Sequence, residues 1–217
     1  MLSVLDDNIW FPPANEADED GLLAIGGDLR VERLLAAYKL GIFPWYSNEV
    51  ILWWNPNPRF VLYPHKLKVS KSMMQVIRSN SYKITINQNF KDVITACKTV
   101  DRKEQQGTWI DENMINAYTQ LHQLGYAYSV EVWNKKQLVG GLYGIKMGHI
   151  FFGESMFSKM PNASKFGFIK FVEYLINEGV TLIDCQVYTK HLESLGAEMI
   201  ERSLFLDILT TNSVIYY

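Results

Sequence analysis

Three short stretches rich in aromatic and β-branched residues follow one another in the second half of the chain: YAYSVEVW (residues 126–133), QLVGGLYGI (137–145) and IFFGESMF (150–157). Turn residues separate them, so we predict three antiparallel strands in a meander. The apolar stretch ASKFGFIKFVEYLINE (163–178) ends at Gly179 and is predicted to be a long helix. It leads into TLIDCQV (181–187), which we predict to be a buried strand parallel to the last strand of the meander.

Antiparallel strands, then a helix and a parallel strand, are the order of elements in α/β folds of the N-acetyltransferase (GNAT) type. The predicted fold class is therefore α/β (α+β), with a mixed, largely antiparallel sheet. A GNAT enzyme that uses coenzyme A usually carries a glycine-rich loop for the pyrophosphate at the start of the long helix. Here that turn reads MPNASK (160–165) and has no such glycines, so we expect the fold without coenzyme A.

The N-terminal part of the chain has a different composition. Four of the six Trp residues and five of the seven Pro residues precede Arg59, which is typical of a small, turn-rich unit. After it, the pattern predicts a strand over 82–86 and helices over 90–99, 111–124 and 204–209, the second of them capped by Asp111. We therefore predict a small N-terminal α+β domain over residues 1–61 and a GNAT-like domain over residues 62–217.

Composition limits the classes of function. With 217 residues, 48% hydrophobic and 20% charged, the chain is typical of a globular protein and not of a disordered or fibrous one. The net charge of −2 means that any site for a polyanion must be local. Cys97 and Cys185 lie far apart and no His pair has ligand spacing, so no metal site is predicted. No apolar run reaches the roughly 18–20 residues of a membrane helix, and no secretory signal begins the chain, so a cytoplasmic protein is expected.

Asp184 and Gln186 form the most unusual polar pair in the sequence. They stand two residues apart in a predicted buried strand, so both side chains should leave the same face, while Cys185 points to the other. Such a pair either satisfies neighbouring backbone groups or acts on a substrate. Glu154, on a strand expected to lie close, is a third polar candidate.

Aromatic residues offer two further candidates, each with a plain alternative. Phe168, Phe171 and Leu175 share one side of the long helix and either pack in the core or line an apolar ligand pocket. The residues Trp45, Trp53, Trp54 and Trp109 are either core fillers or platforms on which nucleobases stack. Two groups of basic residues near them are candidates for phosphate contacts: Lys66, Lys68, Lys71, Arg78 and Lys83 in one, and Lys98, Arg102 and Lys103 in the other.

The chain resembles the leucyl/phenylalanyl-tRNA–protein transferase family in stretches that keep the family's order and cover nearly the whole chain. They are GLLAIGGDL (21–29), GIFPWY (41–46), LWWNPNPR (52–59), GTWI (107–110), SVEVW (129–133), LVGGLYG (138–144), FGESMFS (152–158), ASK (163–165), IDCQ (183–186), and His191 with SLGA (194–197). Among the departures, Asn55 and Asn57 stand where the family usually has Ser and Asp, and Tyr128 where it commonly has His.

This resemblance implies an enzyme that moves Leu or Phe, and Met less well, from its tRNA to the amino terminus of a protein beginning with Arg or Lys. The product is marked for degradation. The resemblance also implies a small N-terminal domain, a GNAT-like C-terminal domain, and no metal or coenzyme A. The expected partners are the 3′ aminoacyl-adenosine ends of Leu-tRNA and Phe-tRNA and the acceptor protein, with no membrane.

Site residues follow from the same resemblance. Gln186 would hold the attacking amine through its side-chain oxygen, while Asp184 polarises the Gln186 amide. Trp45 and Trp109 would lie near the terminal adenosine, and Glu154 would help to hold the aminoacyl adenosine. The donor side chain would enter a pocket built by Leu142, Phe168, Phe171, Leu175 and Ile183.

Two rival functions remain at this stage. One is an aminoacyl-tRNA-dependent transferase that acts on cell-wall precursors; such enzymes are typically longer and have two GNAT-like domains, which disfavours this reading for 217 residues. The other is a module that binds RNA 3′ ends without catalysis. Asp184 and Gln186 are hard to explain in such a module, and an assay for transfer separates the two functions.

Overall fold

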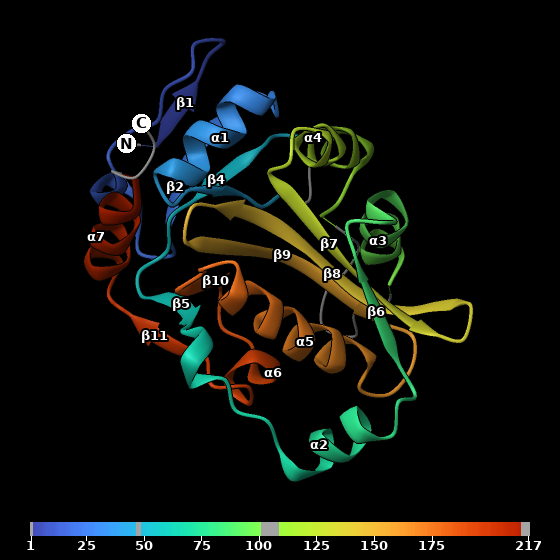
Figure 1. Cartoon of the computed structure of the whole chain (residues 1–217). Coiled ribbons are helices and arrows are strands. Elements are labelled where there is room, and N and C mark those ends of the chain that lie inside the picture. The colour runs from blue at the N-terminus through green and yellow to red at the C-terminus, as the bar shows by residue number, and fades with distance from the viewer. Residues whose placement is uncertain (1, 47–48, 101–108, 214–217) are drawn as a thin grey trace.

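Two sheets and the helices around them make up the computed structural model, which describes residues 2–46, 49–100 and 109–213 (Figure 1). The larger sheet has the strand order β11-β5-β10-β9-β8-β7-β6, and the smaller one has the order β1-β2-β4-β3. The strands are β1 (Ser3–Leu5), β2 (Leu22–Gly26), β3 (Phe43–Pro44), β4 (Leu52–Trp54), β5 (Arg59–Leu62), β6 (Lys83–Ile86), β7 (Ala127–Asn134), β8 (Gln137–Met147), β9 (Ile150–Ser158), β10 (Leu182–Gln186) and β11 (Glu198–Ile200).

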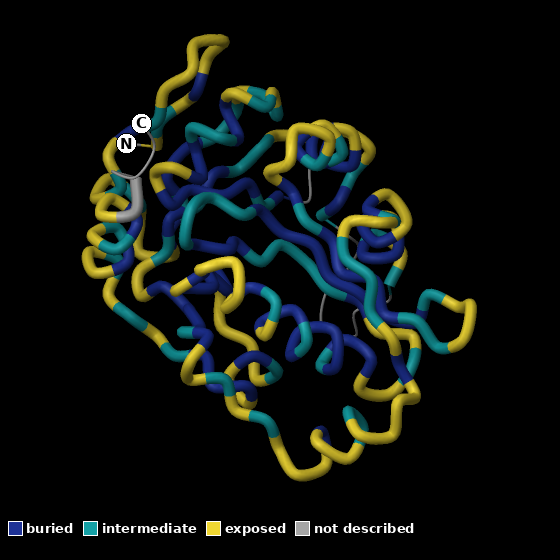
Figure 2. The backbone as a smooth tube through the Cα atoms, in the orientation of Figure 1, coloured by how far each residue is buried: buried dark blue, intermediate teal, exposed yellow. Residues whose placement is uncertain are grey.

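Helices cover both faces of the larger sheet. The α-helices are α1 (Val31–Lys39), α2 (Lys71–Arg78), α3 (Phe90–Thr99), α4 (Glu112–Gln123), α5 (Ala163–Asn177), α6 (Lys190–Glu193) and α7 (Arg202–Ser213). Neighbouring residues of β8 show the layering, because a side chain at Gly140 would meet Ala163 of α5 and one at Gly141 would meet Val93 of α3. An apolar core therefore lies on each side of the sheet, and the central strands between them are largely buried (Figure 2).

The predicted meander and crossover are confirmed. β7, β8 and β9 pair antiparallel, and β10 runs parallel to β9, with Leu182 opposite Ile150 and Asp184 opposite Phe152. Asp111 caps α4 as expected, since its Oδ1 accepts the Met114 N–H at 2.7 Å. The predicted α/β class with a mixed, largely antiparallel sheet is therefore correct. No helix within the described ranges is long and apolar enough to cross a membrane.

Neither β5 nor α2 is predicted from the sequence pattern, and the final helix is longer than predicted. β5 inserts antiparallel between β10 and β11, so the chain returns to the larger sheet directly after the proline-rich segment. α7 begins before and ends after the predicted 204–209, and its residues Phe205 and Leu209 pack against Gly41 of the N-terminal unit. The domain boundary after residue 61 stays a prediction; it falls within β5.

A matched pair of glycines tests the packing of β8 against β9. Gly144 and Gly153 lie opposite each other, and neither has a positive φ. A Cβ at Gly144 would lie 2.2 Å from the Phe152 carbonyl oxygen, whereas the nearest atom to a Cβ at Gly153 is 3.4 Å away. Since backbone must shift only in the first case, we expect Gly144→Ala to lower the free energy of unfolding by about 2–3 kcal/mol or more.

Gly153→Ala is the control, and it should change the free energy of unfolding in urea by less than about 1 kcal/mol. Equal losses in the two variants would contradict the packing described for this strand pair.

Candidate active site

The candidate site lies where β9 and β10 stop pairing. Their ladder covers only three residue pairs and ends at Asp184 opposite Phe152. β9 continues for six more residues, of which 153–156 are partly exposed, whereas Phe151 and Phe152 before them are buried. Two parallel strands that part within a sheet leave a gap with side chains of both strands at its edges. Glu154 of β9 and Gln186 of β10 lie at the edges of this gap.

Glu154 is held from three directions at this gap. Its Oε1 accepts the Tyr38 hydroxyl of α1 at 2.7 Å and the Gln186 Nε2–H at 2.8 Å, and its Oε2 accepts the Tyr118 hydroxyl of α4 at 3.2 Å. The two hydroxyl oxygens also lie 2.5 Å apart; because each hydroxyl has a single proton, the two tyrosines can donate to only two of the three contacts that they make with each other and with Glu154 at a time. Burial, together with the nearby Glu154 carboxylate, raises the pKa of both tyrosines well above the usual range, so both remain donors.

The environment of Glu154 also changes its proton affinity. Burial raises the pKa of the Glu154 carboxyl to about 7, although the hydrogen bonds from Tyr38, Tyr118 and Gln186 act in the opposite direction. The negative charge of Asp184 adds to the increase. Glu154 therefore changes its charge near neutral pH.

Asp184 is bound differently from the arrangement that the sequence suggested. Both of its oxygens accept hydrogen bonds from Arg59, from Nε at 2.8 Å and from Nη2 at 2.6 Å, and neither side chain is exposed. Asp184 Oδ1 also accepts the backbone N–H of Gln186 at 2.9 Å. The Gln186 carboxamide N–H, which Asp184 was expected to polarise, donates to Glu154 instead.

Gln186 has an unusual backbone. Its φ is +63°, and the Val187 N–H donates to the Cys185 carbonyl at 2.8 Å, so Gln186 is the central residue of a γ-turn of the rare, strained form. The pairing of β10 with β5 slips by one residue at the same place, between Asp184 and Gln186. Simple alternation along the strand thus ends at Asp184, and the turn brings the Gln186 side chain to Glu154.

The residues expected to form the donor pocket lie together in the apolar core on the α5 side of the sheet. Phe171 is fully buried and packs edge-on against Phe151, with ring centres 4.9 Å apart. Ile183 brings this core next to Asp184 along β10. The full set is Leu142, Phe168, Phe171, Leu175 and Ile183, each at most 4% exposed. Their role in holding a donor side chain stays a prediction.

The tryptophans divide into core fillers and partly exposed rings. Trp53 is fully buried and donates its Nε1–H to the Gly26 carbonyl, so it is a filler and not a platform. Trp45, Trp54 and Trp109 are partly exposed, and Trp54 donates to the Trp45 carbonyl at 2.6 Å. A hydrogen bond connects the loops that carry Trp45 and Trp109. In it the hydroxyl of Tyr46, which follows Trp45, donates to Asp111, two residues after Trp109, at 3.3 Å.

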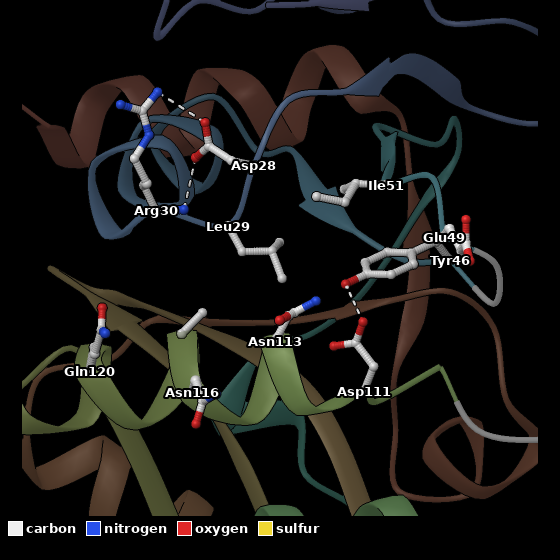
Figure 3. Close-up of a pocket in the computed structure, with 11 residues that line it drawn as sticks. Asp28, Leu29, Arg30, Tyr46, Glu49, Ile51, Asp111, Asn113, Asn116 and Gln120 are labelled. Atoms are coloured by element: carbon white, nitrogen blue, oxygen red, sulfur yellow. Dashed lines mark hydrogen bonds and ion pairs between the residues drawn. The ribbon is translucent and has the colours of Figure 1, made fainter. Parts of the chain in front are cut away.

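A cavity of about 410 Å³ lies beside this junction (Figure 3). It separates α4 from the loop before α1 and from the start of β4, with Leu29 and Asn113 facing each other across it and Tyr46 and Asp111 at one end. None of the predicted site residues lines it. No pattern in the sequence predicts this cavity, because its walls come from loops and from the outer face of α4.

Ion pairs occupy parts of the two basic groups. Lys66 pairs with Glu198 of β11, and Lys98 pairs with Glu112 at the start of α4. Arg102 and Lys103 lie outside the described residues. Contacts of these groups with phosphates stay a prediction.

Three residues that hold the site together were not predicted from the sequence pattern. Tyr38 and Tyr118 occupy apolar faces of their helices, where a tyrosine is normally only a core residue. Arg59 ends the quoted stretch LWWNPNPR, and an arginine within an otherwise apolar strand was the one available signal that a buried anion lies nearby.

Comparison with known proteins identifies relatives over most of the chain. The family model described as leucyl/phenylalanyl-tRNA protein transferase matches residues 61–210, and the model for the N-terminal domain of the same family matches residues 27–57. The leucyl/phenylalanyl-tRNA–protein transferase of Flavobacterium johnsoniae is 56% identical over 203 residues, which are 93% of this chain and 96% of that protein. The one of Pseudomonas fluorescens is 52% identical over 213 residues, or 96% and 94% of the two chains.

Solved structures give a weaker likeness. A GCN5-related N-acetyltransferase-like protein from Streptococcus suis has a TM-score of 0.39 and 14% identity, covering 67% of this chain and 60% of that one. A GCN5-related N-acetyltransferase from Kribbella flavida has a TM-score of 0.39 and 10% identity, covering 76% and 59%.

The pKa of Glu154 predicts a pH dependence of stability. A pKa of about 7 in the folded protein, above the usual value near 4.5, means that the folded state binds more protons than the unfolded state between these values. The stabilisation is complete below about pH 4.5 and is lost as pH rises through 7. Relative to Glu154→Gln, the free energy of unfolding of the wild type should therefore fall by about 2–3 kcal/mol between pH 5 and pH 8.

Urea unfolding of both proteins at one-unit pH steps measures this difference. If the two stability curves ran parallel, Glu154 would not titrate near neutral pH in the folded protein.

Proposed function

The chain belongs to the leucyl/phenylalanyl-tRNA–protein transferase family, and we propose that this aminoacyltransferase joins its two substrates in the gap between β9 and β10. The donor is an aminoacyl-tRNA and the acceptor is the amino terminus of a protein. The single observation that supports this location best is the hydrogen bond of 2.8 Å between Gln186 and Glu154 at the edge of that gap.

The reaction needs little chemical activation. The aminoacyl ester of a tRNA is already reactive, so the enzyme has to place a neutral α-amine against the ester carbonyl and stabilise the tetrahedral oxyanion. An α-amine with a pKa of about 7.7–8.0 is partly neutral at physiological pH. As the new C–N bond forms and the ester C–O bond breaks, the nitrogen loses one proton and the ribose oxygen gains one, so no net proton is consumed.

Gln186 is suited to hold the amine. Its Nε2–H is committed to Glu154, which leaves the carboxamide oxygen as the acceptor that an incoming amine N–H can use. A neutral amide is a very weak base, so Gln186 orients the amine and does not take its proton. Glu154, with its pKa of about 7, is the carboxylate that accepts the Gln186 N–H. We therefore assign to Glu154 the polarising role that the family resemblance gave to Asp184.

The donor is proposed to lie across the gap. Its leucine or phenylalanine side chain would displace or enter the apolar core that contains Phe168 and Phe171, while its terminal adenosine would lie near the partly exposed Trp45 and Trp109. A ring on which a base stacks contributes about 1–3 kcal/mol without reading the sequence, which suits an enzyme that recognises the common 3′ end of tRNAs.

The family resemblance supports a more specific choice of donor and acceptor. We propose that the donors are Leu-tRNA and Phe-tRNA, with Met used less well, and that the acceptors begin with Arg or Lys. Transfer then marks the acceptor for degradation in the cytoplasm. No second function is favoured by a specific observation, and a module that only binds RNA would have no use for the strained turn at Gln186.

Gln186→Ala should separate rate from binding. With radiolabelled Leu-tRNA and a reporter protein that begins with Arg, we expect kcat to fall about 100-fold or more while the KM for the donor stays within about threefold, because the lost contact orients the amine only. The same reporter beginning with Met is the control and should not be labelled.

Equal losses of donor affinity and rate would assign Gln186 to donor binding. Labelling of both reporters by the wild type would contradict the proposed acceptor class.

Phe171→Leu tests the donor pocket. One methyl group in an apolar pocket is worth about 1–3 kcal/mol, so the wild type should prefer Leu-tRNA over Val-tRNA by only about 10–200-fold. Removing the Phe171 ring relieves crowding at the pocket wall and should reduce this preference several-fold. Phe157→Leu is the matched control, since Phe157 is equally buried but lies in the core on the other face of the sheet. An unchanged preference in Phe171→Leu would mean that the pocket lies elsewhere.

A further inference from the structure

Arg59 is the largest charged group buried beside the candidate site, and the proposed reaction does not yet use it. Its side chain is fully buried in β5, next to β10 in the larger sheet. Its guanidinium donates through two parallel hydrogen bonds to both oxygens of Asp184, at 2.8 and 2.6 Å. A two-pronged contact of this kind fixes the orientation of the carboxylate as well as its position.

The oriented Asp184 carboxylate in turn holds the backbone of the γ-turn at Gln186. Its Oδ1, which accepts the Arg59 Nε–H, also accepts the backbone N–H of Gln186 at 2.9 Å. Gln186 is the central residue of the strained γ-turn. Its φ is +63°, a value that residues other than glycine rarely adopt. Such strain persists only where the surroundings fix the conformation, and the hydrogen bond that the Gln186 N–H donates to Asp184 does so from within the sheet.

Two aromatic rings pack on the Arg59 guanidinium, one from the N-terminal and one from the C-terminal part of the chain. Its central carbon lies 4.8 Å from the centre of the Phe43 ring in β3 and 4.6 Å from the centre of the Phe205 ring in α7. The start of α7 is tied to the segment before Arg59, since the Arg202 N–H donates to Asn57 Oδ1 at 2.9 Å and Arg202 Nη1 donates to the Asn55 carbonyl at 2.8 Å. The position of the Arg59 guanidinium thus depends on both the N-terminal unit and the C-terminal helix.

We infer that Arg59 is a positioning residue for aminoacyl transfer: through Asp184 it holds the backbone turn that presents the Gln186 carboxamide to Glu154 and to the amine. This inference rests on the proposed role of Gln186. Lysine cannot replace arginine here, because an ammonium group offers neither the planar fork for two parallel bonds nor a flat face for two rings.

The test compares Arg59→Lys with Arg33→Lys. Arg33 is the matched control, since it is also a fully buried arginine with a carboxylate partner, but its polar contacts are with Asp6 and Asp28 in the N-terminal unit. At a temperature where both variants are folded, we expect Arg59→Lys to lower kcat at least 30-fold with a donor KM within threefold of the wild type. Arg33→Lys should keep kcat within about threefold, whatever its melting temperature.

A second readout does not depend on activity. Hydrogen exchange of the peptide that covers residues 183–188 should accelerate at least tenfold in Arg59→Lys and stay unchanged in Arg33→Lys, because only the first variant releases the Gln186 N–H. If the wild type transferred neither Leu nor Phe, the proposed function would fail, and this exchange experiment would still test the positioning of the turn.

Phe205→Leu keeps the ion pair and removes one ring, so it serves if Arg59→Lys does not fold; its kcat should fall about 3–10-fold at unchanged KM. A folded Arg59→Lys with wild-type kcat would overturn the inference, as would equal losses of kcat in the two lysine variants. Where Arg59→Lys does not fold, a wild-type kcat in Phe205→Leu would do the same.

Discussion

The buried ion pair between Arg59 and Asp184 is the constraint on which the rest of the site depends. Removing either partner would leave an isolated charge in an apolar core, which typically costs about 3–5 kcal/mol. The pair joins β5 to β10, and the two rings around the guanidinium add β3 and α7 to the same point. One interaction therefore connects the N-terminal and the C-terminal parts of the chain at the strand that carries Gln186.

From this fixed point the site extends towards the substrates. The strained turn at Gln186 releases β10 from the regular ladder, and the gap beside β9 contains a carboxylate with a pKa of about 7. Tyr38 and Tyr118 bring helices from both parts of the chain onto that carboxylate. The arrangement needs no strong base, in keeping with a reaction whose ester is already activated and whose amine is partly neutral.

Much of the fold could be predicted from the sequence, because β7, β8, β9 and α5 are long and have clear apolar patterns. β5 could not, since it has four residues after a proline-rich stretch and its partner Asp184 lies 125 residues away. The same limit applies to the site. The polar pair Asp184 and Gln186 could be recognised in the sequence. The turn at Gln186 and its hydrogen bond to Glu154 could not, because they depend on Arg59 and on the tyrosines of α1 and α4, which lie far away in the sequence.

The central claim is that Glu154 and Gln186 act as one unit on the attacking amine. A double-mutant cycle on kcat with Glu154→Gln, Gln186→Ala and the double variant measures this most directly. If the carboxamide works only while Glu154 orients it, the double variant should be about as slow as the slower single variant. Losses that multiply, so that the double variant is slower by the product of the two single effects, would contradict the account.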